Sequence, residues 1–265
     1  MENFFHFTAW PMVPPVPYSA FHIILGLSGI ILSLISARLL AGSVFSRHHS
    51  DCILFLSGLF LSVCELYKQG FLYTIVNSGR YDWWYFPFQL CSVPMYLCLL
   101  YPFLPSDRRH PIINKINCAV FIQDFGLLGG FMALADPSGL MHPYWTLTLH
   151  GFIWHFILIF LGFYCCFSRI SDVSTEGFFR VLPLFFLCCI IATVINVAAG
   201  PDGNADMFYI TPYYPSLQRV FHTIALFAGI IPGNIVYLFC VCLGAGLVHK
   251  GCRRLTALPH IMLKA

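Results

Sequence analysis

Charged residues are scarce in this sequence: Asp, Glu, Lys and Arg make up 9% of it, whereas 58% of its residues are hydrophobic. The mean hydropathy is +0.78. A water-soluble chain of 265 residues could not bury this much apolar surface, so lipid must solvate a large part of it. The net charge of +3 is small and the basic residues are grouped, so we do not expect a nucleic-acid partner.

The sequence also lacks signals for a cleaved signal peptide, for disulfides and for cofactor binding. No Lys or Arg precedes the first apolar run, so we expect no cleaved signal peptide and a first helix that stays in the mature protein. Eleven of the twelve cysteines lie inside apolar runs, and their spacing fits neither a disulfide framework nor zinc ligation. We also find no nucleotide or haem motif, and we therefore predict no metal and no required soluble cofactor.

Long apolar runs dominate what is present. A helix needs about 20 apolar residues to cross a hydrocarbon core of about 30 Å. Seven runs meet this length, and the connections between them are short, which predicts an all-α bundle of seven transmembrane helices in one domain over residues 1–265, with its core at 20–250. The predicted spans are Ala20 to Phe45, Cys52 to Val76, Trp84 to Leu104, Ile112 to Ala135, Trp145 to Phe167, Phe178 to Gly200 and Leu217 to His249.

The basic residues predict the orientation of this bundle. Lys and Arg gather on the cytoplasmic side of membrane proteins. If the seven spans alternate, Arg80 and Arg219 fall on one side, Lys68 lies inside the second helix, and all the others fall on the opposite side. Those others are Arg38, Arg47, Arg108, Arg109, Lys115, Arg169, Arg180, Lys250, Arg253, Arg254 and Lys264. We therefore expect an outside amino terminus and a cytoplasmic carboxyl terminus, most simply in the plasma membrane.

Ionisable side chains at membrane depth are costly unless they are paired or face a cavity, so each indicates a functional site. Glu65 and Lys68 lie three residues apart on the second predicted helix, which places them on one face where they can form an ion pair. Asp124 lies near the middle of the fourth helix. These three residues also suggest an alternative function, a carrier or channel with an ion pathway.

Depth along the helices brings further polar residues together. With a rise of about 1.5 Å per residue, Cys91 and His150 both lie roughly 8 to 10 Å below the outer ends of their helices. Asn196 and His222 fall in a similar layer, while Glu65, Lys68 and Asp124 lie somewhat deeper. We therefore expect polar residues of helices two to seven to converge on one outward-opening cavity.

A cysteine and a histidine in one cavity suggest nucleophilic catalysis. The imidazole can take the thiol proton to form a thiolate and later protonate a leaving group. Spacing alone does not choose Cys91 over Cys98 or Cys118 as the nucleophile. An apolar site between helices suits an acyl chain, and a thioester intermediate would allow transfer between lipids without coenzyme A.

Short motifs, taken in order, resemble those of the YwaF-like integral membrane proteins. They are Glu65 with Lys68, Pro87-Phe88-Gln89-Leu90-Cys91, Gly126 to Gly130 followed by Ala135-Asp136-Pro137, Leu149-His150-Gly151, and Asn196 followed by Gly200, Asn204 and Met207-Phe208. The resemblance spans about residues 20 to 250. The chain departs from the family pattern in the outer loop, where Asn204-Ala205-Asp206-Met207 replaces a compact Asn-Tyr-Met, and at Ala135, where Thr is common.

That family includes the transmembrane protein 164 acyltransferase, which forms polyunsaturated ether phospholipids and is thought to use a cysteine nucleophile. The resemblance implies Cys91 as nucleophile and His150 as acid/base, with membrane phospholipids as substrates. We place Glu65, Lys68, Gln89, Asp124, Asn196 and His222 in a supporting polar cluster, with Asn196 or backbone amides steadying the oxyanion. A membrane protein without catalytic activity is a further alternative.

Overall fold

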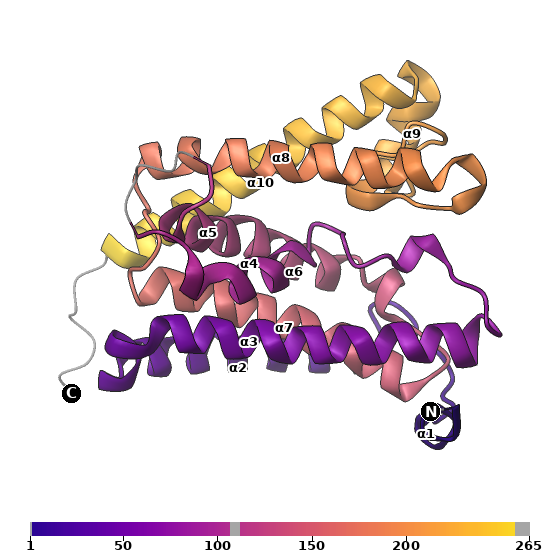
Figure 1. Cartoon of the computed structure of the whole chain (residues 1–265), viewed down its shortest axis with the longest axis horizontal. Helices are drawn as coiled ribbons and strands as arrows, with labels where there is room; N and C mark the ends of the chain where they lie inside the picture. The colour runs from indigo at the N-terminus through magenta and orange to yellow at the C-terminus, as the bar shows by residue number, and fades with distance from the viewer. Residues whose placement is uncertain (1, 107–111, 258–265) are drawn as a thin grey trace.

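A computed structural model describes residues 2–106 and 112–257 of the chain and contains helices but no strand within them (Figure 1). Six helical segments are long and apolar enough to cross a membrane. They are α2 (Ala20–Gly42), α3 with η1 (Val44–Phe71 and Leu72–Val76), α5 with η4 and α6 (Lys115–Phe121, Ile122–Gly126 and Leu127–Ala135), α7 (Trp145–Phe167), α8 (Thr175–Ala199) and α10 (Ile230–Ala257). The predicted all-α membrane bundle is confirmed, and the α7 bounds are those predicted.

Short helical segments make up the rest. They are α1 (Glu2–Thr8), η2 (Trp83–Tyr85), α4 (Val93–Leu100), η3 (Tyr101–Phe103), η5 (Pro137–Leu140), η6 (Pro201–Gly203), η7 (Met207–Tyr209) and α9 (Arg219–Ala228). Two of the segments within the spans, η1 and η4, are π-helical. A π-helical turn adds a residue to the helix and occurs often at functional sites.

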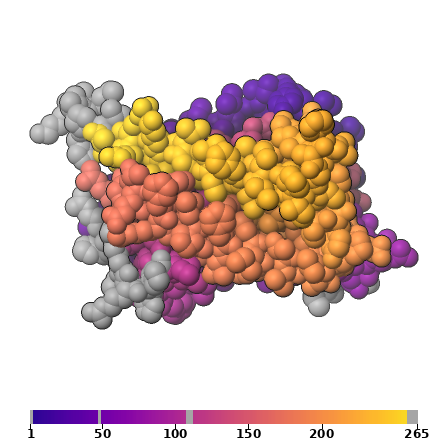
Figure 2. All heavy atoms as spheres, turned by 90° about the horizontal axis from the view of Figure 1, so that it is seen from above, coloured from indigo at the N-terminus to yellow at the C-terminus, as the bar shows by residue number. Residues whose placement is uncertain are grey.

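The segment formed by α5, η4 and α6 lies at the centre of the bundle. It runs between the group α2, α3 and α7 on one side and the group α8, α9 and α10 on the other (Figure 1), and 67% of its apolar window is buried. By contrast, only 22% is buried in α2 and in α10. Figure 2 shows α8, α9 and α10 side by side on one face of the molecule. Many of their exposed side chains, such as Phe239 and Leu247, are apolar, as a surface in contact with lipid requires.

The third predicted span, Trp84 to Leu104, is not one continuous helix. Its backbone is irregular over residues 86–92, and only the short helices α4 and η3 follow. Irregular backbone at membrane depth persists only where protein or a cavity supplies partners for its polar groups. Here the carbonyls of Tyr85, Pro87 and Cys91 accept hydrogen bonds from the side chains of Gln69, Tyr96 and Trp154. Hydropathy cannot reveal these partners, so the sequence suggested an unbroken helix.

The seventh predicted span, Leu217 to His249, is also divided. Gly229 separates α9 from α10 and has a φ of +99°, a conformation that favours glycine. Pro232 follows in the first turn of α10, where its missing N–H costs no helical hydrogen bond. The apolar composition continues across this break, which explains why the sequence suggested one helix.

The orientation of the bundle and its count of seven spans stay predictions. Residues 77–106 carry the chain back along the bundle after α3, and α1 lies at the end opposite the carboxyl end of α10 (Figure 1). Of the basic residues used for the orientation, Arg108, Arg109 and Lys264 lie outside the described residues, as does the side chain of Arg47. The single domain over 1–265 likewise stays a prediction.

Candidate functional site

A cavity of about 470 Å³ lies among α3, α6, α7 and α10 and is also lined by residues of the segment 84–92 and of η7. This volume falls within the range of sites that hold drug-sized ligands. Five of the residues predicted to form the site line it, namely Glu65, Lys68, Gln89, Cys91 and His150. The remaining three, Asp124, Asn196 and His222, do not line it. Depth along the helices therefore located most of the site but could not show which way each side chain points.

Cys91 lies in the turn that precedes α4. Its backbone carbonyl accepts a hydrogen bond of 3.1 Å from Nε1 of Trp154 on α7. On the other side the turn approaches α6, where a Cβ on Gly129 would lie 3.7 Å from the Cβ of Cys91. The turn is thus held between α6 and α7, and the thiol lies at the wall of the cavity. Of the alternative nucleophiles, Cys98 and Cys118 are both fully buried and neither lines the cavity.

His150 lies on α7, one helical turn before Trp154. The two rings stack with their centroids 5.5 Å apart and an interplanar angle of 29°. Nε2 of His150 is buried and has no hydrogen-bond partner within the part of the chain that the structure describes. Leaving a buried polar atom unpaired costs about 1 to 3 kcal/mol. His150 lines the cavity, and an imidazole in such a position can act as an acid or base toward a substrate.

Glu65 and Lys68 form the predicted ion pair, with 2.8 Å between Nζ and Oε1. The amide of Gln69 donates a second hydrogen bond of 2.7 Å to the same carboxylate oxygen. Glu65 is buried, so these two donors compensate its charge. The pair gives the otherwise apolar cavity a charged patch that can bind a polar group.

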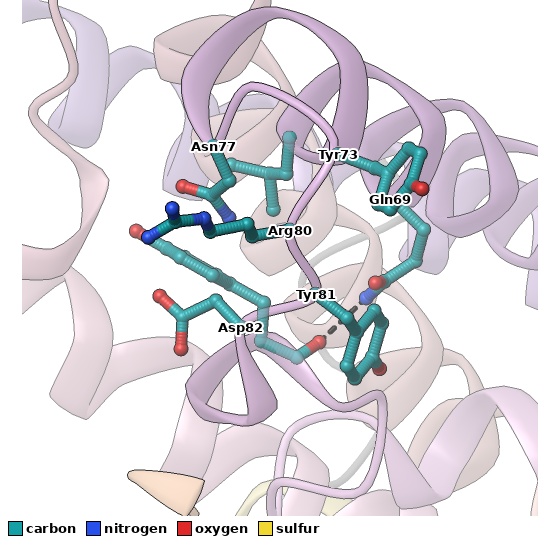
Figure 3. Close-up of a pocket in the computed structure, with 8 residues that line it drawn as sticks. Gln69, Tyr73, Asn77, Arg80, Tyr81 and Asp82 are labelled. Carbon is teal, nitrogen blue, oxygen red and sulfur yellow. Dashed lines mark hydrogen bonds between the residues drawn. The ribbon is translucent and has the colours of Figure 1, made fainter.

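A second pocket lies beside this patch, among Gln69, Tyr73, Asn77, Arg80, Tyr81 and Asp82 (Figure 3). Its volume is about 10 Å³. A single water molecule needs about that much space. The pocket is therefore too small for a substrate, although its side chains are polar.

Gln89 and Asn196 hold the same stretch of the outer loop from two sides. Gln89 donates to the carbonyl of Asp206 and accepts from the N–H of Phe208, while Asn196 bonds both backbone groups of Met207. We call residues 206–208 together with these two amide side chains the amide clasp. Asn196 is buried and both polar groups of its side chain are occupied, so it is placed to hold the loop rather than to steady an oxyanion.

The clasp stabilises a strained backbone. Phe208 and Tyr209 have φ values of +58° and +57°, which non-glycine residues rarely adopt. Such strain persists only where surrounding contacts fix it, and it gathers at functional sites. Its consequence here is that the Tyr209 side chain lines the cavity, beside Tyr237 and Trp84.

Asp124 belongs to a separate buried network. Its carboxylate contacts Nδ1 of His249 at 2.8 Å and accepts a hydrogen bond of 2.8 Å from Gln123. Nε2 of His249 bonds the carbonyl of Ser174 at 2.9 Å. The network connects η4, the loop after α7 and the end of α10. Glu65 and Lys68 thus share a cavity with Cys91, whereas Asp124 does not.

His222 has a hydrogen-bond partner close to it in the sequence, because its Nδ1 bonds the carbonyl of Ser216 at 2.9 Å.

Sequence reasoning missed other residues that line the cavity: His142, His155 and Trp154. Burial lowers the pKa of His142, so this ring is neutral near pH 7. The spacing of Trp154, four residues after His150, was a usable signal, because it places both rings on one face of a helix. His142 lies in a loop and gave no such signal.

These features define a class: a multi-pass helical membrane protein whose cavity combines a thiol, imidazoles and an ion pair with an apolar wall. The model of the TMEM164 family matches residues 17–244. This match covers most of the chain, and the protein belongs to the TMEM164 family. Neither the curated proteins nor the solved structures gave a match. The YwaF-like resemblance and the choice of membrane stay predictions.

Proposed function

We propose that the protein transfers acyl groups between membrane phospholipids, with Cys91 as nucleophile and His150 as general acid and base. One observation carries this proposal: Cys91 and His150, which come from different segments, line the same cavity. Trp154 contacts both residues and so ties their positions together.

The reaction has two steps. In the first, His150 takes the thiol proton, and the sulfur of Cys91 attacks the ester carbonyl of a donor lipid. The ester C–O bond breaks, and the lysolipid leaves as an alcohol after His150 returns the proton to its oxygen. In the second step a hydroxyl of an acceptor lipid attacks the thioester and gives its proton to His150. The carbon–sulfur bond then breaks, and the thiolate recovers the proton.

The remainder of the cavity suits this chemistry. Its wall is largely apolar, with Leu90, Leu128 and Met132 among the lining residues, which favours an acyl chain over water. Excluding water protects a thioester from hydrolysis. The Glu65–Lys68 pair supplies charges of both signs for a phospholipid head group. No coenzyme is needed, because the donor lipid itself carries the acyl group.

The first test is acyl transfer by purified protein in liposomes that contain a labelled phospholipid donor and a lysolipid acceptor. We expect Cys91→Ser to lower the rate by a factor on the order of 10³ or more, as removal of a nucleophile does. Cys52→Ser is the matched control, because Cys52 is exposed and lies outside the cavity. A rate that Cys91→Ser leaves unchanged contradicts the assignment of the nucleophile.

Labelling with a lipid-like cysteine electrophile, mapped by mass spectrometry, tests the role of His150. We expect His150→Ala to slow labelling of Cys91 but not of Cys240, which lines the same cavity and serves as an internal comparison. Uniform labelling of the cysteines would favour the alternative, a carrier or channel. That alternative predicts a proteoliposome flux that Glu65→Gln abolishes and Cys91→Ser does not change.

A further inference from the structure

Two helix faces, one on α6 and one on α10, line the cavity together. On α10, Tyr237, Cys240, Val241 and Gly244 line it, and on α6, Leu128, Gly129, Met132 and Ala133 do so. The spacing of three and four residues places each set on one face of its helix. The two faces therefore act together as the wall between the cavity and the outside of the bundle, which we call the α6–α10 wall.

This wall carries exposed side chains. Met132 is 55% exposed and Cys240 is also exposed, although both line the cavity. Side chains that line a cavity and are also exposed lie where the cavity can open. The two helices approach each other closely at one point, because a Cβ on Gly244 would lie 3.0 Å from the side chain of Leu128. Both helices belong to candidate membrane-spanning segments, so an opening between them would face lipid rather than water.

We infer that the α6–α10 wall is a lateral portal through which an acyl chain of a membrane lipid enters the cavity. The residues of the opening are apolar or small, which suits hydrocarbon and offers no partner to a charged solute. The polar residues Glu65, Lys68 and His150 line the same cavity from α3 and α7, so a lipid can keep its chain in the portal while its polar part meets them. This inference supplies a route of substrate entry for the proposed function. It rests on that function for what happens to the acyl chain inside the cavity.

Photo-crosslinking tests the portal without relying on catalysis. The protein is placed in phosphatidylcholine vesicles that contain an analogue with a diazirine in its acyl chain, and adducts are mapped by mass spectrometry. We expect adducts on Leu90 and Leu147, which line the cavity. Leu147 is only 4% exposed, so bulk lipid cannot reach it from the outer surface.

Blocking the portal should remove those inner adducts. Met132→Trp places a large ring in the opening, and we expect adducts on Leu147 to fall about tenfold, equivalent to about 1.4 kcal/mol. Leu243→Trp is the matched control, because Leu243 is 53% exposed on α10 but does not line the cavity. Inner adducts that are absent in the wild type, or that Met132→Trp leaves unchanged, would overturn the portal.

The same samples separate the portal from the proposed function. In Cys91→Ser the portal predicts unchanged inner adducts, because binding of the chain does not need the thiol. Inner adducts together with acyl transfer that survives Cys91→Ser would uphold the portal and reject the nucleophile. Acyl transfer that depends on Cys91 but not on Met132, with no inner adducts, would uphold the nucleophile and reject the portal.

Discussion

Trp154 is the residue that both members of the proposed catalytic pair touch. Its N–H holds the backbone of Cys91, and its ring stacks on His150. Phenylalanine keeps an aromatic ring at this position but cannot donate a hydrogen bond. The variant Trp154→Phe therefore separates the anchoring of Cys91 from the support of His150.

For Trp154→Phe we expect a fall in kcat of about tenfold with little change in KM, because a loss of geometry raises the barrier of the chemical step by about 1.4 kcal/mol. The pH profile of Cys91 labelling should keep its shape, since His150 is still stacked. Trp145→Phe, near the exposed start of α7, is the control. Equal losses in both variants would show that Trp154 has only a structural role.

Asp206 is a buried carboxyl in the amide clasp. Its Oδ1 accepts the N–H of Thr211 at 2.9 Å, and its Oδ2 has no partner among the described residues. Burial raises its pKa to about 7, whereas Tyr209 and Tyr214 nearby have pKa values raised to about 12 and stay neutral. Between about pH 4 and pH 7 the folded protein therefore keeps a proton on Asp206 that the unfolded chain has lost.

This proton makes stability depend on pH. The contribution of Asp206 is greatest at low pH and is lost as the pH rises to about 7, by up to about 1.4 kcal/mol per pH unit. Asp206→Asn has no ionisable group here, so we expect its melting temperature to fall less than that of the wild type between pH 5 and pH 8. Thermal unfolding in micelles measures both curves. Parallel curves would show that Asp206 is already ionised in the folded protein.

At the scale of elements, α4 depends on a close approach to α3. A Cβ on Gly58 would lie 2.9 Å from the Leu99 N–H nitrogen and 3.0 Å from the Met95 carbonyl oxygen. These are backbone atoms, so α4 itself would have to move, and Cys91 lies directly before α4. The placement of the proposed nucleophile thus depends on a glycine in another helix.

Gly58→Ala should therefore destabilise the protein by about 1 to 3 kcal/mol, as overpacking does, and slow the labelling of Cys91. Gly42→Ala is the control, because a Cβ there meets no atom within 4 Å. Melting temperature and labelling rate report the two effects separately. A variant at Gly58 with wild-type stability would show that α4 can shift at little cost.

The helices also show which parts of the fold could be predicted from the sequence. Hydropathy predicted α7 to the residue and placed α2 and α8 within a few residues, because these helices are uniformly apolar and uninterrupted. It failed at residues 86–92 and at Gly229, where the composition stays apolar but the backbone leaves the helix. The partners that permit the first break, such as Trp154, come from elsewhere in the chain and leave no local pattern.

For the whole molecule, depth along the helices was enough to bring Glu65, Lys68, Cys91 and His150 to one cavity. Depth could not show that Asn196 lies outside this cavity, because depth gives the layer of a residue and not the direction in which its side chain points. His249, the partner of Asp124, lies far away in the sequence, so nothing local pointed to the pair. Contacts between residues on different helices depend on how the helices pack against one another. A local sequence pattern does not reveal that packing.

The orientation of the bundle is testable at the same scale. The segregation of Lys and Arg predicts a cytoplasmic carboxyl terminus and an outside amino terminus. We expect an epitope after residue 265 to be reached by antibody only after cells are permeabilised, and an amino-terminal epitope to be reached in intact cells. The reverse pattern would contradict the predicted orientation and place the cavity near the cytoplasmic surface.

The irregular segment 86–92 has a consequence for biosynthesis. It leaves the ribosome before Trp154 and before residues 206–208, which bond Cys91 and Gln89 in the finished fold. During translation the carbonyl of Cys91 therefore reaches the membrane before its final partner exists, although hydrocarbon does not tolerate an unpaired backbone group. We expect this carbonyl to need another partner until Trp154 is made, and a chain truncated at residue 200 to lack the loop that bonds the side chain of Gln89.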